Sequence, residues 1–324
     1  MRRIPALDGL RGVAILLVTG YHFYGRPSGG FFGVDLFFVL SGFLITTLLL
    51  EEHTATGAVS VAAFYVRRAR RLMPAAGLVV LAFLPVVGWR VAAAGGLYAA
   101  NFVRAFAHPD PLYAMPLDHF WSLAQEEQFY LLWPPLLIVA LRRLSRRRLI
   151  AVLALLFAAV SLYRVGLAAS GESWSRLYFG PDTHASGLIL GCLAAAARPR
   201  VSPLLGRVGL MMVVVLAFVG SPTMPWELIG LPAAELAAVL AVTSAAANTH
   251  RILSAKPLVW LGGISYSLYL WQQPVRWLFG FDTRQPMVPL ALAVLLAWLS
   301  AVRIERRFRY RHSHPEAVPS PAVG

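Results

Sequence analysis

The sequence predicts an all-α integral membrane protein, a bundle of about ten transmembrane helices with both termini in the cytoplasm. Of its 324 residues, 58% are hydrophobic and only 14% are charged, whereas about a quarter of the residues in soluble domains are charged. The apolar residues form runs long enough to cross about 30 Å of hydrocarbon, which takes about twenty helical residues. Arginines cluster between these runs, as they do in cytoplasmic membrane loops.

Ten apolar runs meet this length requirement. They are residues 8–26, 31–51, 73–91, 122–141, 149–168, 183–198, 207–221, 232–248, 258–280 and 286–303. The first run follows a basic start, as a signal peptide does, but it carries Asp8, Arg11 and His22 and lacks a small-residue cleavage pattern. We therefore expect a retained first membrane helix.

An eleventh stretch, residues 95–107, is ambiguous by hydropathy, and the positions of the arginines decide its placement. If it stays at the outer surface or re-enters, all basic clusters fall on one side; if it spans, they scatter to both faces. Ten spans with cytoplasmic termini are the better topology. Residues 1–309 are expected to form the transmembrane domain, and the polar, proline-rich tail 310–324 is expected to be disordered.

The net charge of +14 does not indicate nucleic-acid binding, because the cations lie in short clusters between apolar runs. The expected environment is instead the lipid bilayer. The single cysteine, Cys192, excludes an intrachain disulfide and a cysteine metal cluster. No histidine pair has i, i+4 spacing and no other tight ligand pattern occurs, so no metal site is predicted.

Arg11 and His22 in the first run are the strongest candidates for chemistry, because ionisable residues inside spans usually mark function or an internal pair. They are eleven positions apart, so they share a helix face about 16 Å apart along the axis. Arginine can hold a phosphate, and histidine can remove a hydroxyl proton near neutral pH. The alternative is that Arg11 pairs with Asp8 and His22 bonds a neighbouring helix.

Glu126 and Glu127 lie about a turn or two inside the fourth span, at a depth comparable with His22. One of them could orient the His22 ring and stabilise its imidazolium form, which predicts a dyad of histidine and carboxylate. The two acids diverge by about 100° around a helix, so only one is expected to face inward. The alternative is a capping acid at a helix that begins with Ser122.

Other polar residues lie at the ends of the spans. Asp35, Asp182 and His184 at outer ends are expected either to line an outer cavity or to be interfacial. The cytoplasmic segment 64–74 carries Arg67, Arg68, Arg70 and Arg71, which are expected to bind phosphates or anionic lipid, or only to signal topology. Four serines lack the Gly-x-Ser-x-Gly elbow and are expected to bond across helices: Ser41, Ser122, Ser265 and Ser267.

Five segments match a known pattern in order. They are residues 7–12 with His22, 33–43, 64–74, 119–130 and 261–271. On these segments the chain resembles the membrane acyltransferase-3 family of bacterial O-acyltransferases over nearly its whole length. The resemblance implies a ten-helix bundle that moves an acyl group, with acetyl expected, from cytoplasmic acyl-coenzyme A to a hydroxyl of a sugar, envelope polymer, lipid or secondary metabolite. Acyl-CoA would be a co-substrate, and no cofactor would be bound.

Carried over position by position, the resemblance makes His22 the catalytic base, Glu126 the important acid and Arg11 a donor-site residue. It also favours donor binding by Arg67, Arg68 and Arg71. The candidates for acceptor binding are Asp35, Asp182, His184 and Gln272.

The chain departs from the family pattern at two places. Gln272 stands where many relatives have histidine, which implies an altered acceptor pocket, and residues 303–308 lack the usual proline. Many larger relatives carry a C-terminal hydrolase-like domain. The resemblance therefore implies that this chain transfers directly to its final acceptor or works with a separate extracytoplasmic partner that handles the acyl group.

Two other classes of function are compatible with a polar path through a helical bundle. A transporter of a polar or glycosylated substrate would commonly show inverted repeats, and the sequence shows no internal repeat. A membrane scaffold for envelope assembly would tolerate replacement of His22 and Glu126 without losing more than stability.

Overall fold

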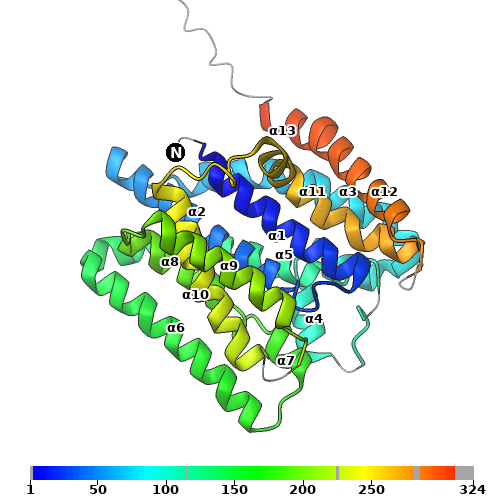
Figure 1. Ribbon diagram of the computed structural model, residues 1–324, viewed down its shortest axis with the longest axis horizontal. Coiled ribbons are helices and arrows are strands. Elements are labelled where there is room, and N and C mark those ends of the chain that lie inside the picture. Colours follow the sequence, from blue (N-terminus) through cyan, green and yellow to red (C-terminus); the bar gives the residue numbers. More distant parts are fainter. Residues whose placement is uncertain (1–2, 108, 114, 224–225, 281–284, 311–324) are drawn as a thin grey trace, which may run out of the picture.

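The structure, a computed structural model, describes residues 3–107, 109–113, 115–223, 226–280 and 285–310, and within them it is all-helical (Figure 1). The longer helices are α1 (Pro5–Tyr24), α2 (Phe32–Thr56), α3 (Val61–Gly96), α5 (Phe120–Arg143), α6 (Arg146–Ala169), α8 (Ser186–Ala197), α9 (Pro203–Val219), α10 (Leu231–Ala247), α11 (Lys256–Leu278) and α12 (Met287–Ser300). The short ones are α4 (Ala100–Phe106), α7 (Trp174–Phe179), α13 (Arg306–Tyr310) and the π-helices η1 (Trp226–Gly230) and η2 (Ala301–Glu305).

Each predicted apolar run coincides with one of the longer helices in the described part of the chain. The ambiguous stretch 95–107 forms the seven-residue helix α4 after the end of α3. A helix of that length is about 10 Å long and cannot cross a bilayer. The tail predicted to be disordered lies outside the described residues from residue 311 onward.

Five helical stretches are long and apolar enough to cross a membrane by themselves. They are Phe32–Thr56, Val61–Gly96, Arg146–Ala169, Leu228–Ala247 and Met287–Phe308. The most apolar window of α6 is only 17% buried within the protein, and α6 lies at one edge of the bundle with α12 near the opposite edge (Figure 1). Two leucines of α6 are largely exposed, Leu155 at 69% and Leu162 at 70%. This apolar exterior identifies a multi-pass membrane protein.

Helices α1, α5 and α11 do not meet the same criterion, because polar side chains lower their hydropathy. Helix α1 carries Arg11 and His22, α5 carries two adjacent glutamates, and α11 carries Gln272 and Arg276. Polar groups are costly in hydrocarbon, so helices of this kind face the interior of a bundle. They are the helices that build the site described below.

Glycines allow the central helices to approach closely. Helix α1 packs against α11, and a Cβ added at Gly262 would collide with the carbonyl oxygen of Asp8. Helix α2 packs against α8 in the same way, since a Cβ at Gly191 would collide with the Val39 carbonyl oxygen. Small residues at such contacts let backbones meet where lipid gives no hydrophobic drive for association.

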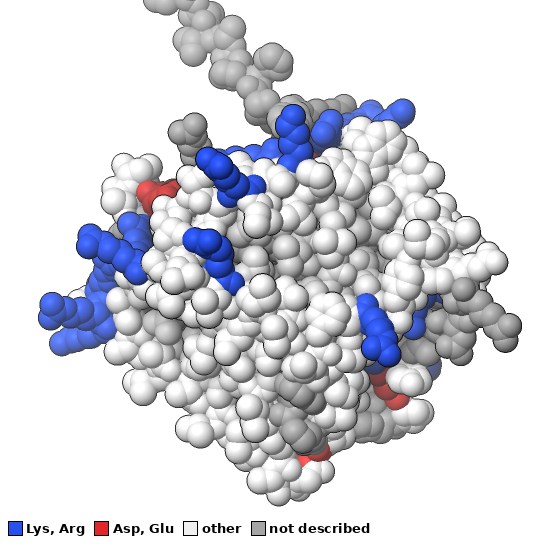
Figure 2. All heavy atoms as spheres, viewed as in Figure 1, with Lys and Arg blue, Asp and Glu red and all other residues white. Residues whose placement is uncertain are grey.

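The surface charge is unevenly distributed. In Figure 2 most arginine and lysine side chains lie along the upper and left margin of the molecule, and an uncharged expanse separates them from a smaller charged group at the lower right. The first described residues and α13 both lie on the upper side of the molecule (Figure 1). This arrangement suits a protein with one strongly basic membrane face.

Candidate active site

One cavity lies among α1, α2, α3, α5 and α11 and has three arginines in its wall. Its volume is about 110 Å³, and it is lined by Arg11, Arg68 and Arg71 together with Glu126 and Glu127. We call it the arginine cavity. Guanidinium groups are the side chains best suited to bind phosphate and other planar or tetrahedral anions.

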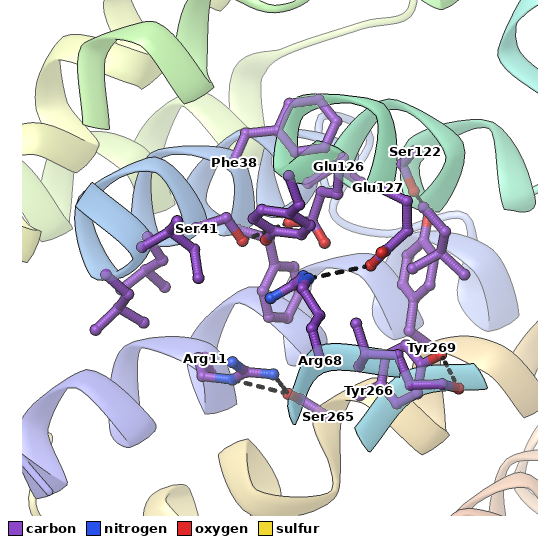
Figure 3. Close-up of a pocket in the computed structure, with 18 of the residues that line it drawn as sticks. Arg11, Phe38, Ser41, Arg68, Ser122, Glu126, Glu127, Ser265, Tyr266 and Tyr269 are labelled. Atoms are coloured by element: carbon purple, nitrogen blue, oxygen red, sulfur yellow. Dashed lines mark hydrogen bonds and ion pairs between the residues drawn. The ribbon is translucent and has the colours of Figure 1, made fainter. Parts of the chain in front are cut away.

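The contacts in the arginine cavity join helices that are distant in sequence (Figure 3). Arg11 on α1 donates through Nε and Nη2 to Ser265 Oγ on α11, at 3.3 and 3.2 Å. Arg68 on α3 pairs with Glu127 on α5, at 3.3 Å between Nε and Oε1, and its guanidinium carbon lies 3.0 Å from the centroid of the Tyr130 ring. Each guanidinium group has more N–H donors than these bonds use, so donors remain for a ligand.

A second cavity, of about 460 Å³, contains two histidines in its wall, His22 and His119. We call it the histidine cavity. Polar groups of Arg104, Asp118 and Arg276 also line it. Much of the remaining wall is aromatic: Tyr21, Phe31, Trp121, Trp174, Tyr178 and Phe179. A wide, mainly apolar cavity with a few convergent polar groups is typical of a small-molecule site.

His22 is buried in the wall of the histidine cavity, with Gln272 and Arg276 of α11 on one side and His119 on another. Its Nδ1 atom is buried and has no hydrogen-bond partner within the described part of the chain. A nitrogen in this state can accept a proton from a hydroxyl that enters the cavity. Gln272 lies near this ring, but the adjacent Gln273, and not Gln272, lines the histidine cavity.

Asp118 and His119 form the turn that leads into α5. Burial raises the pKa of Asp118 to about 6, although Arg104, at 3.8 Å between Nη1 and Oδ2, lowers it. Burial lowers the pKa of His119 to about 3, and the nearby His22 acts in the same direction. His119 is therefore neutral at physiological pH, whereas Asp118 titrates close to that range.

Two residues line both cavities, Val34 on α2 and Tyr269 on α11. The Tyr269 hydroxyl lies 2.5 Å from Ser122 Oγ on α5 and donates to the carbonyl oxygen of His119 at 3.2 Å. The arginine cavity and the histidine cavity are thus neighbours that share one wall.

The prediction that His22 and Glu126 form a dyad is wrong, because the two side chains line different cavities. Glu126 lines the arginine cavity, where Ser41 Oγ donates to its Oε1 atom at 2.5 Å, while His22 lines the histidine cavity. Comparable depth along two helices does not fix the direction in which each side chain points. Both Glu126 and Glu127 face the arginine cavity, so the expectation that only one acid points inward is also wrong.

Arg67 does not join the other arginines. It is 58% exposed and lies 3.7 Å from Glu52 on α2, between Nη2 and Oε2. Neighbouring positions diverge by about 100° around a helix, so Arg68 can face the cavity while Arg67 faces away. Of the four predicted donor residues, Arg11, Arg68 and Arg71 line the arginine cavity.

Asp35 and His184 lie in neither cavity wall. Both are completely buried and bind each other, at 2.8 Å between His184 Nε2 and Asp35 Oδ1. His184 Nδ1 lies 2.5 Å from the carbonyl oxygen of Tyr178. The two ring nitrogens thus lie beside oxygen atoms of two different helices, Asp35 on α2 and Tyr178 on α7.

Asp182 also lies away from the two cavities. It forms a bidentate ion pair with Arg176 of α7, at 2.8 Å between Nη1 and Oδ1 and 2.5 Å between Nη2 and Oδ2. Its side chain is 44% exposed and lines neither cavity. Asp35, His184 and Asp182 therefore do not line the outer cavity that the sequence predicted. Gln272 is the predicted acceptor residue that the structure does bring next to His22.

The serine prediction is confirmed. The hydroxyl groups of the four serines bond across helices, to Glu126, Tyr269, Arg11 and Glu305. No group of three or more histidine, cysteine, aspartate and glutamate side chains within the described ranges has a metal-binding arrangement.

Sequence reasoning missed several residues of the histidine cavity, namely His119, Asp118, Arg276 and Tyr269. His119 and Tyr269 lie inside the motifs that carry the family resemblance. Arg276 follows Gln272 by four positions, which places both on one face of α11. That spacing is the signal that could have identified Arg276.

The chain matches the acyltransferase domain of the acyltransferase-3 family over residues 4–302. It is similar to the O-acetyltransferase OatA of Staphylococcus aureus (strain NCTC 8325 / PS 47), with 33% identity covering 95% of this chain and 56% of that protein. It is also similar to the peptidoglycan O-acetyltransferase OatA of Listeria monocytogenes, with 31% identity covering 94% of this chain and 55% of that protein. The chain thus spans about half the length of these relatives. No solved structure matches it. With the family pattern covering nearly all of its helices, the chain belongs to the acyltransferase-3 family.

Proposed function

We propose that this protein is a membrane O-acyltransferase that moves an acetyl group from cytoplasmic acetyl-CoA to a hydroxyl of a cell-envelope glycan. Arg11 and His22 lie on one helix and line two cavities that meet at Val34 and Tyr269, and this observation carries the proposal. The names of the similar proteins support acetyl as the group and an envelope polymer such as peptidoglycan as the acceptor class.

The arginine cavity is the proposed donor site. Arg68 and Arg71 come from the basic segment that begins α3, and Arg11 lies one to two turns from the start of α1. These cations suit the phosphates and polar groups of coenzyme A. The cavity is the smaller of the two, at about 110 Å³ against about 460 Å³, which suits a thioester arm better than a sugar ring.

The histidine cavity is the proposed acceptor site, and His22 is the proposed general base. As the acceptor oxygen bonds to the thioester carbonyl carbon, the hydroxyl proton passes to His22. The carbon–sulfur bond then breaks, and the coenzyme A thiolate takes up the proton to leave as the free thiol. The products are free coenzyme A, which is released, and one ester, which is formed on the final acceptor or on a group that a separate extracytoplasmic partner then handles.

The proposed orientation has ten spans and both termini in the cytoplasm. The positive-inside rule supports it, because the first described residues and α13 lie on the side where most arginines gather. In this orientation the basic segment of α3 meets cytoplasmic coenzyme A, and the histidine cavity lies toward the outer face.

A transporter is the rival function, since two adjoining cavities could also form a translocation path. Inverted membrane vesicles separate the two functions, because their outer surface is the former cytoplasmic face. An acyltransferase releases coenzyme A and leaves alkali-labile acetyl esters on lumenal glycan. A transporter moves the glycan precursor without consuming the thioester.

The vesicles for this test come from a deletion strain that carries either the wild-type gene or His22→Ala. Radiolabelled acetyl-CoA should give alkali-labile label in the wild-type vesicles and none in the variant. Mass spectrometry of envelope glycans should show one acetyl mass missing from the deletion strain. Wild-type vesicles that transfer no label would contradict the proposed function.

A further inference from the structure

We infer that Tyr269, together with Val34, restricts transfer to short acyl groups by forming the partition between the two cavities. The inference rests on the proposed function, since it concerns the acyl group that passes from the arginine cavity toward His22. The two residues alone line both cavities among the described residues. They are 6% and 5% exposed, so both side chains are buried between the two cavities.

Three helices pass from one cavity to the other at the level of this partition, so the two cavities follow one another along the bundle. Each of these helices contributes residues to the arginine cavity on one side of the partition and to the histidine cavity on the other. The pairs, arginine cavity first, are Arg11 and His22 on α1, Glu126 and Trp121 on α5, and Ser265 and Arg276 on α11. Helix α2 contributes Ser41 to the arginine cavity and Val34 to the partition itself.

The Tyr269 ring is held in place from α5. Its hydroxyl lies 2.5 Å from Ser122 Oγ and 3.2 Å from the carbonyl oxygen of His119, to which it donates. The ring also meets the His119 ring edge-on, with centroids 5.4 Å apart. Ser122 lines the arginine cavity and His119 the histidine cavity, so the bonds of Tyr269 anchor it at the boundary itself.

A fixed aromatic ring at this position limits what can reach His22. The thioester carbonyl has to come to the partition for the acceptor hydroxyl to attack it. An acetyl group adds only a methyl beyond that carbonyl, whereas butyryl adds two further methylenes that have to fit beside Tyr269 and Val34. One methylene too many in an apolar pocket lowers a rate by about 10- to 200-fold.

The test uses the same inverted vesicles, supplied in parallel with radiolabelled acetyl-CoA and butyryl-CoA, and counts alkali-labile label in the lumenal glycan. Wild type should transfer acetyl at least about tenfold faster than butyryl. Tyr269→Ala should reduce this ratio at least about tenfold by raising the butyryl rate. Val34→Ala opens the partition from the opposite side and should shift the ratio in the same direction.

Two further variants test whether the acetyl preference depends on the hydrogen bonds of Tyr269 and on the position of its ring. Tyr269→Phe keeps the ring but removes the bonds that fix it, so its preference for acetyl should be weaker than that of wild type and stronger than that of Tyr269→Ala. Trp89→Ala removes a 71% exposed ring that lines neither cavity and should leave the ratio unchanged. The amount of each variant in the vesicles is measured by immunoblot, and its folding by gel filtration in detergent.

The possible results distinguish failure of this inference from failure of the proposed function. Wild-type vesicles that transfer neither acyl group would overturn the proposed function and this inference with it. Acetyl transfer with the wild-type ratio in both Tyr269→Ala and Val34→Ala would overturn this inference alone. If Tyr269→Ala is not folded, the ratio in Val34→Ala decides.

Discussion

Arg11 and His22 lie on the same helix but line different cavities, and Tyr269 stands at the boundary between those cavities. The helix thus carries at one level a cation that can bind a phosphate of the co-substrate, and at another level a base that can take a proton from a hydroxyl. Their separation of about 16 Å along the axis is bridged in our proposal by the donor arm. Substitutions at the two positions should therefore affect different steps, donor binding for Arg11 and proton transfer for His22.

His22→Ala should lower kcat by about 100- to 10,000-fold, the usual contribution of a general base. Binding of acetyl-CoA should persist, because Arg11 and Arg68 are unaffected on the other side of the partition. Isothermal titration with acetyl-CoA and the vesicle assay measure the two effects separately. A variant that keeps its turnover would remove His22 from the mechanism.

Arg68→Ala should raise the KM for acetyl-CoA by about 10- to 100-fold, since a hydrogen bond to a charged group contributes about 1.5–3 kcal/mol. Arg67→Ala is the matched control, because it removes the same charge from the neighbouring position. Arg67 is 58% exposed and pairs with Glu52, so its loss should change KM less than about threefold. Equal effects of the two substitutions would argue for a diffuse electrostatic role.

Asp35→Asn should destabilise the protein by about 1–3 kcal/mol, because it disturbs the fully buried hydrogen bond between this side chain and His184. Asp182→Asn breaks an ion pair whose carboxylate is 44% exposed and should cost about 0–1 kcal/mol. Thermal unfolding in detergent compares the two. A similar Tm for both variants would contradict the larger cost expected for the buried pair.

Asp118→Asn should change how stability depends on pH. The folded carboxyl has a pKa of about 6, raised by burial from 3.8, so the folded state takes up a proton before the unfolded state does. The wild-type free energy of unfolding therefore rises, relative to the variant, as pH falls from about 7 to about 4, by up to about 3 kcal/mol. Unfolding measured at several pH values checks this slope, and parallel curves for the two proteins would contradict it.

Gly262→Ala should destabilise the bundle, because its added Cβ would collide with the Asp8 carbonyl and separate α1 from α11. Overpacking of this kind typically costs about 1–3 kcal/mol. Gly263→Ala is the control, since nothing lies within 4 Å of a Cβ at that position. The thermal midpoint of the first variant should fall while that of the second stays near wild type.

The sequence predicted the helices well because length and apolar content determine where a chain can cross lipid. It also singled out Arg11, His22 and Arg68 by residue type, and the structure places them in the walls of the two cavities. It could not tell that Glu126 faces Ser41 and not His22, because depth along a helix says nothing about rotation about its axis.

The assignment of Asp35 and His184 to an outer cavity was wrong for a related reason. A buried charge within a bundle can serve a ligand or another buried charge, and residue type does not distinguish the two. Only the packing of α2 against the turn before α8 brings these side chains together. The position of Tyr269 between the two cavities was not predicted either. A tyrosine within an apolar helix is usually interpreted as a packing residue.

The wall that Val34 and Tyr269 form between the two cavities has an electrical consequence. In the proposed reaction a proton passes inward from the acceptor hydroxyl to the coenzyme A sulfur, while the acetyl group passes outward in exchange. Reactants and products therefore carry the same charge on each side of the wall, and no net charge crosses the membrane potential. We expect the extent of acetylation to be the same in energised vesicles and in vesicles whose potential is collapsed by valinomycin with potassium.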